Sequence, residues 1–215
     1  MYGVLQDKML IALDYHGVLD LGSSNYWSRD RRNCEVRMPS PGADAVALVQ
    51  TLRRLGFIVW MCSFIQSSEK YRDQCAAFRE QLAEQAGYTM RETPPAPCRN
   101  GLFLLHPGDR IGDQGKAAAC SMYNTRVLVD DRHDICYEAE RWGILAYQVM
   151  SSRAHYQRYI ARSAQEVRWQ TRSCGEFYSH PISQSLDHFR RLIISEVGSG
   201  AFAWKYQAVC EQRQF

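Results

Sequence analysis

The 215-residue sequence predicts an α/β fold in three layers, with a mainly parallel five-stranded sheet and a helical C-terminal extension. Five short apolar runs have the length of buried strands, and each of the first four is followed by a polar residue or a turn signal. Segments with apolar residues at helical spacing lie between consecutive runs. Strands that alternate with helices in this way form parallel sheets through right-handed crossovers.

The first predicted strand, residues 9–13, consists of five apolar residues and runs into Asp14. Gly17 lets the backbone leave this strand sharply. A helix is expected from about residue 43 to residue 55, because its apolar residues recur at helical spacing and Gly56 stops it. The first strand therefore ends in a carboxylate, at the edge where open α/β sheets keep their ligands.

The second predicted strand, residues 57–62, is an apolar run closed by Ser63. A helical pattern follows from about residue 67 to residue 86, with Gly87 as its stop. The next segment is rich in proline, and neither proline nor the residue before it continues a helix easily. A third, short strand at 102–105 follows this connector.

A short helix at 116–120, a strand at 126–129, a helix at 134–142 and a strand at 144–149 complete the predicted sheet. The eight cysteines form no C-x-x-C pair and no zinc-ligand spacing, which favours a reduced protein. No apolar run approaches membrane-spanning length. These observations predict a cytoplasmic protein without membrane contact.

Three regions make up the predicted domain organisation: a core at 1–150, a small flap or cap insertion at 21–40 within it, and an extension at 151–215 that packs on the core. Apolar residues at helical spacing predict a helix at 186–197. The segment 153–172 interleaves arginines with aromatic residues, a composition that suits RNA or DNA. The alternative for this segment is a helix that packs on the core with its arginines in solvent.

Polar residues follow three of the predicted strands. Asp14, Ser63 and the pair Asp130–Asp131 stand at strand ends, and Lys116 begins the helix before the fourth strand. Because all C-terminal ends of parallel strands lie on one edge, these side chains can converge. Carboxylates bind a hard cation such as Mg²⁺, and a hydroxyl and an ammonium hold phosphoryl oxygens. The pattern predicts a phosphate and magnesium site, although each residue alone also suits a turn, a cap or a solvated helix.

Four segments, in order, resemble the motifs of the haloacid dehalogenase-like (HAD) hydrolase superfamily, in its capless or small-cap phosphatase type. Their sequences are DYHGVL at 14–19, CS at 62–63, QGK at 114–116 and VDDRHD at 129–134. The resemblance covers roughly residues 5–150 and implies a three-layer, Rossmann-like domain.

The resemblance also implies a mechanism in which Asp14 becomes an aspartyl-phosphate, with Mg²⁺ as cofactor. The implied catalytic residues are Asp14, His16, Ser63 and Lys116. The implied substrate-binding residues are Ser63, Lys116 and Gly17. The implied metal ligands are Asp14, His16 (through its backbone carbonyl), Asp130 and Asp131. Asp134 is expected to be a helix N-cap. His16 replaces the family's second aspartate, and an imidazole can in principle carry out both of that residue's proton transfers.

The predicted function is therefore a Mg²⁺-dependent phosphatase that acts on a phosphomonoester, either a small molecule such as a nucleotide or a nucleic-acid end. Because of His16, two alternatives stay open. One is a catalytically weak or inactive HAD-like binding module for RNA or a protein partner, and the other is a metal-independent, dehalogenase-like hydrolase that attacks carbon. The short insertion at 21–40 implies an open site and an exposed substrate, unless the C-terminal extension covers it.

Overall fold

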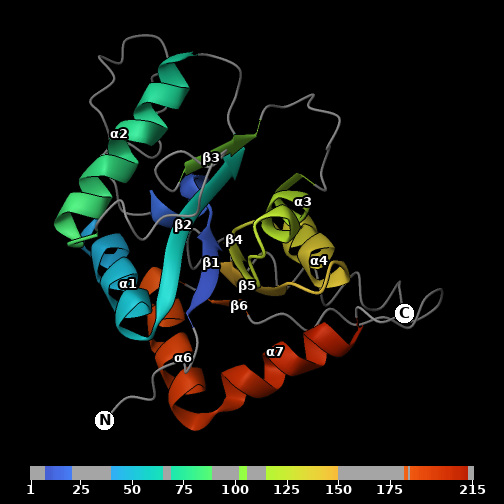
Figure 1. Cartoon of the computed structure of the whole chain (residues 1–215). Helices are drawn as coiled ribbons and strands as arrows, with labels where there is room; N and C mark the ends of the chain where they lie inside the picture. Colours follow the sequence, from blue (N-terminus) through green and yellow to red (C-terminus); the bar gives the residue numbers. More distant parts are fainter. Residues whose placement is uncertain are drawn as a thin grey trace, which may run out of the picture.

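The computed structural model describes residues 8–20, 40–64, 69–88, 102–105, 115–149, 182–183 and 185–212 (Figure 1). These residues form one parallel sheet with helices on both faces. Nearly all of the insertion predicted at 21–40, and the whole basic segment at 153–172, lie outside the described residues.

The sheet has six strands in the order β3-β2-β1-β4-β5-β6, and every neighbouring pair is parallel. The strands are β1 (Met9–Leu13), β2 (Phe57–Phe64), β3 (Leu102–Leu105), β4 (Val127–Asp130), β5 (Leu145–Val149) and β6 (Ile182–Ser183). All five predicted strands are confirmed, but the predicted number was wrong. The sixth strand has two residues and so carries no apolar run in the sequence.

The helices also follow the predicted order, with one addition. They are α1 (Ala43–Arg54), α2 (Glu69–Gln85), α3 (Gly115–Met122), α4 (His133–Arg141), α6 (Leu186–Ser199) and α7 (Ala201–Gln212). Ser185 caps α6 by accepting a hydrogen bond from the His188 N–H, and Gly200 ends it in the left-handed region at φ 81°. Helix α7 was not predicted from the sequence.

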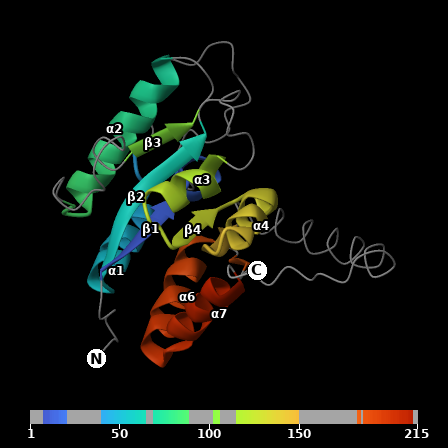
Figure 2. The same cartoon turned by 45° about the vertical axis from the view of Figure 1, so that its right-hand side comes forward.

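Alternation along the strands divides the core into two layers. Ile11 and Leu13 of β1 face a cluster that includes residues of α1, α2, α6 and α7. Ala12, between them, faces a second cluster with residues of α3 and α4. Figure 2 shows α1 and α2 on one side of the sheet and α3 and α4 on the other. The result is the expected three-layer sandwich. From β1 the chain adds strands first on one side and later on the other. Because all crossovers have the same hand, the helices of these two halves lie on opposite faces of the sheet.

Helix α6 is bonded to β5, and α7 is bonded to α6. The Tyr147 hydroxyl donates a 2.6 Å hydrogen bond to Glu196 of α6, and Lys205 of α7 makes an ion pair with the same carboxylate. The Tyr147 ring also lies 5.2 Å from that of Phe189, centroid to centroid. The described part of the extension therefore shares its core with the rest of the sheet. Of the described helices, none is both long and apolar enough to cross a membrane.

Candidate active site

The candidate site lies where the chain changes direction in the sheet. From β1 the chain moves through α1 to β2 on one side, and it later returns to β4 on the other side. Ligands of open α/β sheets bind at such a switch point, outside the carboxyl ends of the strands. Asp14 follows β1, its N–H donates a 2.9 Å hydrogen bond to the Val129 carbonyl, and Asp130 ends β4. The two carboxylates therefore flank the switch point.

Lys116 joins these two strand ends. Its Nζ lies 2.9 Å from Asp14 Oδ2 and 2.5 Å from Asp130 Oδ2, and the residue is only 1% exposed. Burial alone lowers the pKa of Lys116, but the carboxylates of Asp130 and Asp14 outweigh it and raise the pKa above its usual range. Lys116 is therefore a buried, permanently charged ammonium beside the predicted nucleophile.

The two aspartates after β4 have raised pKa values. Burial raises the pKa of Asp130 to about 6, against the opposing effect of Lys116. Burial, followed by the charges of Asp130 and Asp14, raises the pKa of Asp131 to about 8. Near neutral pH, the cluster therefore holds protons that a bound cation would displace.

The donor set fits a hard divalent cation. Asp14, Asp130 and Asp131 each offer a carboxylate oxygen, and these oxygens all lie within 4.8 Å of one another. With Lys116 the four groups carry a net charge of −2 when every carboxylate is ionised. Oxygen ligands with excess negative charge suit Mg²⁺, which would relieve the repulsion that raises the two pKa values.

The turn after β1 packs directly against Asp131. Residues Tyr15–Leu19 form a single π-helical turn, in which Gly17 has φ +86°. A Cβ atom on Gly17 would lie 2.2 Å from Asp131 Oδ2, so only glycine lets the carboxylate come this close. The Gly17 N–H donates a 2.8 Å hydrogen bond to Asp20 Oδ1, which closes the turn. The structure thus gives Gly17 a role in shaping the site, and its substrate contact stays a prediction.

Ser63 and His16 are the two predicted catalytic residues whose contacts the structure defines least. Ser63 is fully buried in β2, beside Leu104 of β3 in the sheet register. It is not the residue that closes the strand, because β2 continues to Phe64. His16 lies within the π-helical turn, and its side chain is outside the described part of the structure. Their catalytic roles stay predictions.

The prediction that Asp134 caps α4 was wrong. Arg132 occupies the N-cap position, and Asp134 lies in the first turn, where its carboxylate pairs with the Arg132 side chain. This pairing lowers the pKa of Asp134, against the effect of burial. The Arg132 N–H donates a 2.9 Å hydrogen bond to Asp130 Oδ1, so the backbone after β4 turns back onto the acidic cluster.

Two buried polar residues near the site were missed from the sequence. Asp20 is 4% exposed and holds Gly17, three positions before it, which is a local turn signal. Gln148 is 2% exposed in β5, and its Nε2 donates a 2.9 Å hydrogen bond to the Asp131 carbonyl. The only sequence signal for Gln148 is one amide in an otherwise apolar strand.

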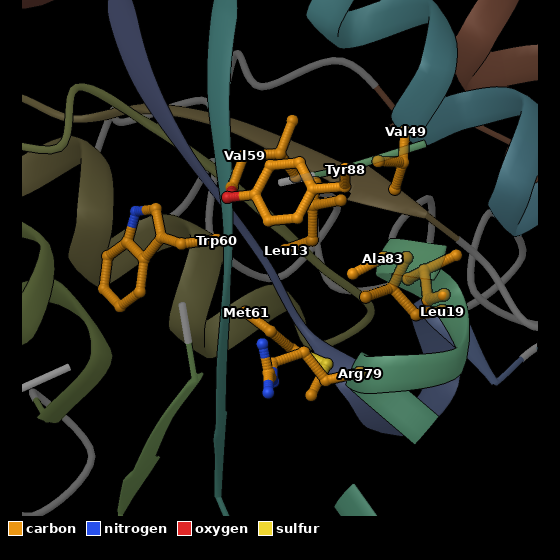
Figure 3. Close-up of a pocket in the computed structure, with 10 residues that line it drawn as sticks. Leu13, Leu19, Val49, Val59, Trp60, Met61, Arg79, Ala83 and Tyr88 are labelled. Carbon is orange, nitrogen blue, oxygen red and sulfur yellow. The ribbon is translucent and has the colours of Figure 1, made fainter. Parts of the chain in front are cut away.

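A mostly apolar cavity lies beside the site, among side chains of the sheet, the turn, α1 and α2 (Figure 3). Leu13, Leu19, Met61 and Leu82 contribute to its lining, and Arg79 adds a guanidinium. None of the predicted site residues lines it. The acidic cluster and Lys116 therefore lie outside this cavity.

Comparisons with known proteins show similarity at the level of the fold. No family model matches the sequence, and no curated protein matches it. Among solved structures, the chain is similar to D,D-heptose 1,7-bisphosphate phosphatase from B. bronchiseptica, crystallised with magnesium and phosphate. The TM-score is 0.51 and the sequence identity 13%, over 87% of this chain and 99% of that one. The chain therefore shares its α/β fold with a phosphatase whose structure contains magnesium and phosphate.

Proposed function

We propose that this chain is a Mg²⁺-dependent phosphatase of the HAD-like superfamily, which hydrolyses a phosphomonoester through a phosphorylated Asp14. The observation that carries the proposal is the buried Lys116 ammonium in contact with both Asp14 and Asp130 at the switch point. A transferred phosphoryl group needs cations at its oxygens, and Lys116 and the acidic metal site supply them next to one carboxylate. The fold shared with a magnesium- and phosphate-bound phosphatase supports the same chemistry.

The chain's own residues account for the steps. Bound Mg²⁺ would supply charge neutralisation at the acidic cluster and the phosphoryl oxygens. The Tyr15 N–H, 2.8 Å from Asp14 Oδ1, and Lys116, 2.9 Å from Oδ2, orient the nucleophilic carboxylate. An Asp14 oxygen attacks phosphorus, the bond to the ester oxygen breaks, and the leaving alkoxide takes a proton. Water then attacks the same phosphorus, loses a proton, and releases phosphate and free Asp14.

The remaining assignments follow the family resemblance. Ser63 and Lys116 hold the phosphoryl oxygens, and His16 gives the proton to the leaving group and takes one from water. By the same resemblance, the short insertion at 21–40 implies an open site and an exposed substrate, either a nucleotide or a nucleic-acid end. The composition of the 153–172 segment suits a contact with nucleic acid. Three clustered carboxylates beside a single ammonium favour metal-dependent chemistry over a metal-independent attack on carbon.

The test is hydrolysis of p-nitrophenyl phosphate with Mg²⁺ and after its removal with EDTA. We expect turnover in the wild type, its loss in EDTA, and a decrease of about 10³-fold or more in Asp14→Asn. Asp44→Asn is the matched control, because Asp44 is an exposed acid of α1. An inactive wild type, or equal turnover in wild type and Asp14→Asn, contradicts the proposal. A large gain in His16→Asp from a near-zero wild-type rate favours the non-catalytic binding module.

A further inference from the structure

The backbone of Asp131 is not held by strand pairing. β4 ends at Asp130, so Asp131 lies beyond the last ladder position, and its carboxylate packs against Gly17. A metal ligand on a loop loses affinity if small backbone rotations move its oxygens, because the ligand set must be held in a fixed geometry. Asp131 therefore needs a contact that fixes its backbone.

Gln148 provides that contact. It lies in β5 opposite Asp130 in the sheet register, and its Nε2 donates a 2.9 Å hydrogen bond to the Asp131 carbonyl. All five residues of β5 are buried, and Gln148 is 2% exposed. Removing its side-chain amide from water therefore costs free energy. A hydrogen bond to the Asp131 carbonyl, which lies beyond the end of β4, offsets this cost.

We propose that Gln148 is a positioning residue that orients the Asp131 carboxylate for binding a divalent cation; the inference rests on the metal site of the proposed function. The Gln148 amide fixes the peptide after Asp131 from β5, while Gly17 sets the approach of the carboxylate from the opposite side. The Arg132 N–H, bonded to Asp130 Oδ1, holds the same peptide from its other end. Between them, these contacts leave the Asp131 side chain directed at Asp14 and Asp130.

The neighbouring residue on β5 offers a matched control. Tyr147 is also buried and also donates a side-chain hydrogen bond, but it does so to Glu196 on the opposite face of the sheet. Gln148→Met removes the amide and keeps nearly the same side-chain volume, whereas Tyr147→Phe removes one buried hydrogen bond far from the acidic cluster. A merely structural role for Gln148 predicts that both variants lose stability and that neither loses metal affinity.

The experiment measures binding of Mg²⁺ by calorimetry and of Mn²⁺ by electron paramagnetic resonance, without substrate. We expect Gln148→Met to bind either ion about 10- to 100-fold more weakly than the wild type, and Tyr147→Phe to bind within about twofold of it. In the phosphatase assay, the half-saturating Mg²⁺ concentration should rise by the same factor, while kcat at saturating Mg²⁺ stays within about threefold. Gln148→Asn, whose amide is one methylene too short, should behave like Gln148→Met and replaces it if the methionine variant does not fold.

The outcomes separate this inference from the proposed function. Equal metal affinity in wild type and Gln148→Met, or equal weakening in Tyr147→Phe, overturns the positioning role. Weakened binding in Gln148→Met together with an inactive wild type supports the positioning role and overturns only the phosphatase. A wild type that binds neither ion overturns both.

Discussion

Replacing Lys116 by methionine removes the buried cation from the acidic cluster and keeps a side chain of similar length. Lys116 is 1% exposed and contacts Asp14 and Asp130 at 2.9 and 2.5 Å, so the variant leaves two buried carboxylates without their counter-ion. Removing one partner from a buried ion pair costs about 3–5 kcal/mol. For a chain of this size, each kcal/mol of lost stability lowers the melting temperature by about 2–4 °C. Lys116→Met should therefore melt about 6–20 °C below the wild type at pH 8.

The loss should be smaller at pH 5. Burial raises the pKa of Asp130 to about 6 even beside Lys116, and removing the ammonium raises it further. A carboxyl group with a higher pKa in the folded than in the unfolded chain takes up a proton on folding, so its contribution to stability falls as pH rises through that folded pKa. At pH 5 the folded variant therefore carries a neutral Asp130, whereas at pH 8 more of the buried carboxyl groups are ionised and repel one another without the ammonium.

The assay is thermal unfolding followed by circular dichroism at pH 5 and pH 8, with and without Mg²⁺. Lys8→Met, which removes an exposed lysine, is the control for the change in net charge. Mg²⁺ at 100 times its dissociation constant should restore about 2.7 kcal/mol, because it supplies positive charge to the folded cluster alone. A stabilising role of the Lys116 charge is refuted if Lys116→Met melts at the same temperature as the wild type at pH 8 in EDTA. It is also refuted if the decrease in melting temperature is the same at both pH values.

Two further predictions concern the proposed metal ligands. Gly17→Ala should weaken Mg²⁺ binding by about tenfold or more, because its Cβ would meet Asp131 Oδ2 at 2.2 Å. Gly87→Ala, with φ +66° and no atom within 4 Å of its Cβ, measures backbone strain alone, and equal effects of both variants on calorimetric affinity would contradict the steric explanation. Mg²⁺ affinity should also rise between pH 6 and pH 8, since Asp131, with its pKa of about 8, must lose a proton to bind the ion. Calorimetry in two buffers of different ionisation enthalpy should detect the released proton. An affinity for Mg²⁺ that does not change with pH would disprove the coupling between metal binding and proton release.

The parts of the fold that could be predicted are those with a local signal. The longer strands were predictable because buried parallel strands are continuous apolar runs, and Asp14 and Asp130 mark the ends of two of them. Convergence at one edge then followed from parallel topology alone. The burial of Lys116 could not be read from its helix, because a lysine in a first turn is ordinarily solvated; it results from two carboxylates on separate strands.

Other features depend on distant partners. In the sequence, Gln148 resembles a polar residue that an apolar strand tolerates. Its role becomes visible only with its hydrogen-bond acceptor, the Asp131 carbonyl in the loop after β4. Strand β6 is too short for any periodicity, and it forms by pairing with an existing edge, that of β5. Helix α7 has its apolar residues spread around the axis, and Phe202 is buried through a contact with Phe57 that only the tertiary fold supplies.

The packing of α6 and α7 with β5 in one core cluster bears on how the polypeptide can be shortened. Leu145, Tyr147 and Val149 belong to the core cluster that Phe189 and Phe202 help to close, and β6 pairs with the outer edge of β5. A fragment that stops at residue 150 would expose the apolar face of β5 to water and leave the outer edge of β5 unpaired. An exposed apolar face and an unpaired strand edge together promote aggregation by strand pairing between copies. Recombinant expression and limited proteolysis should therefore treat residues 182–212 as inseparable from the sheet, and a nascent chain would complete this side only after α7 has left the ribosome.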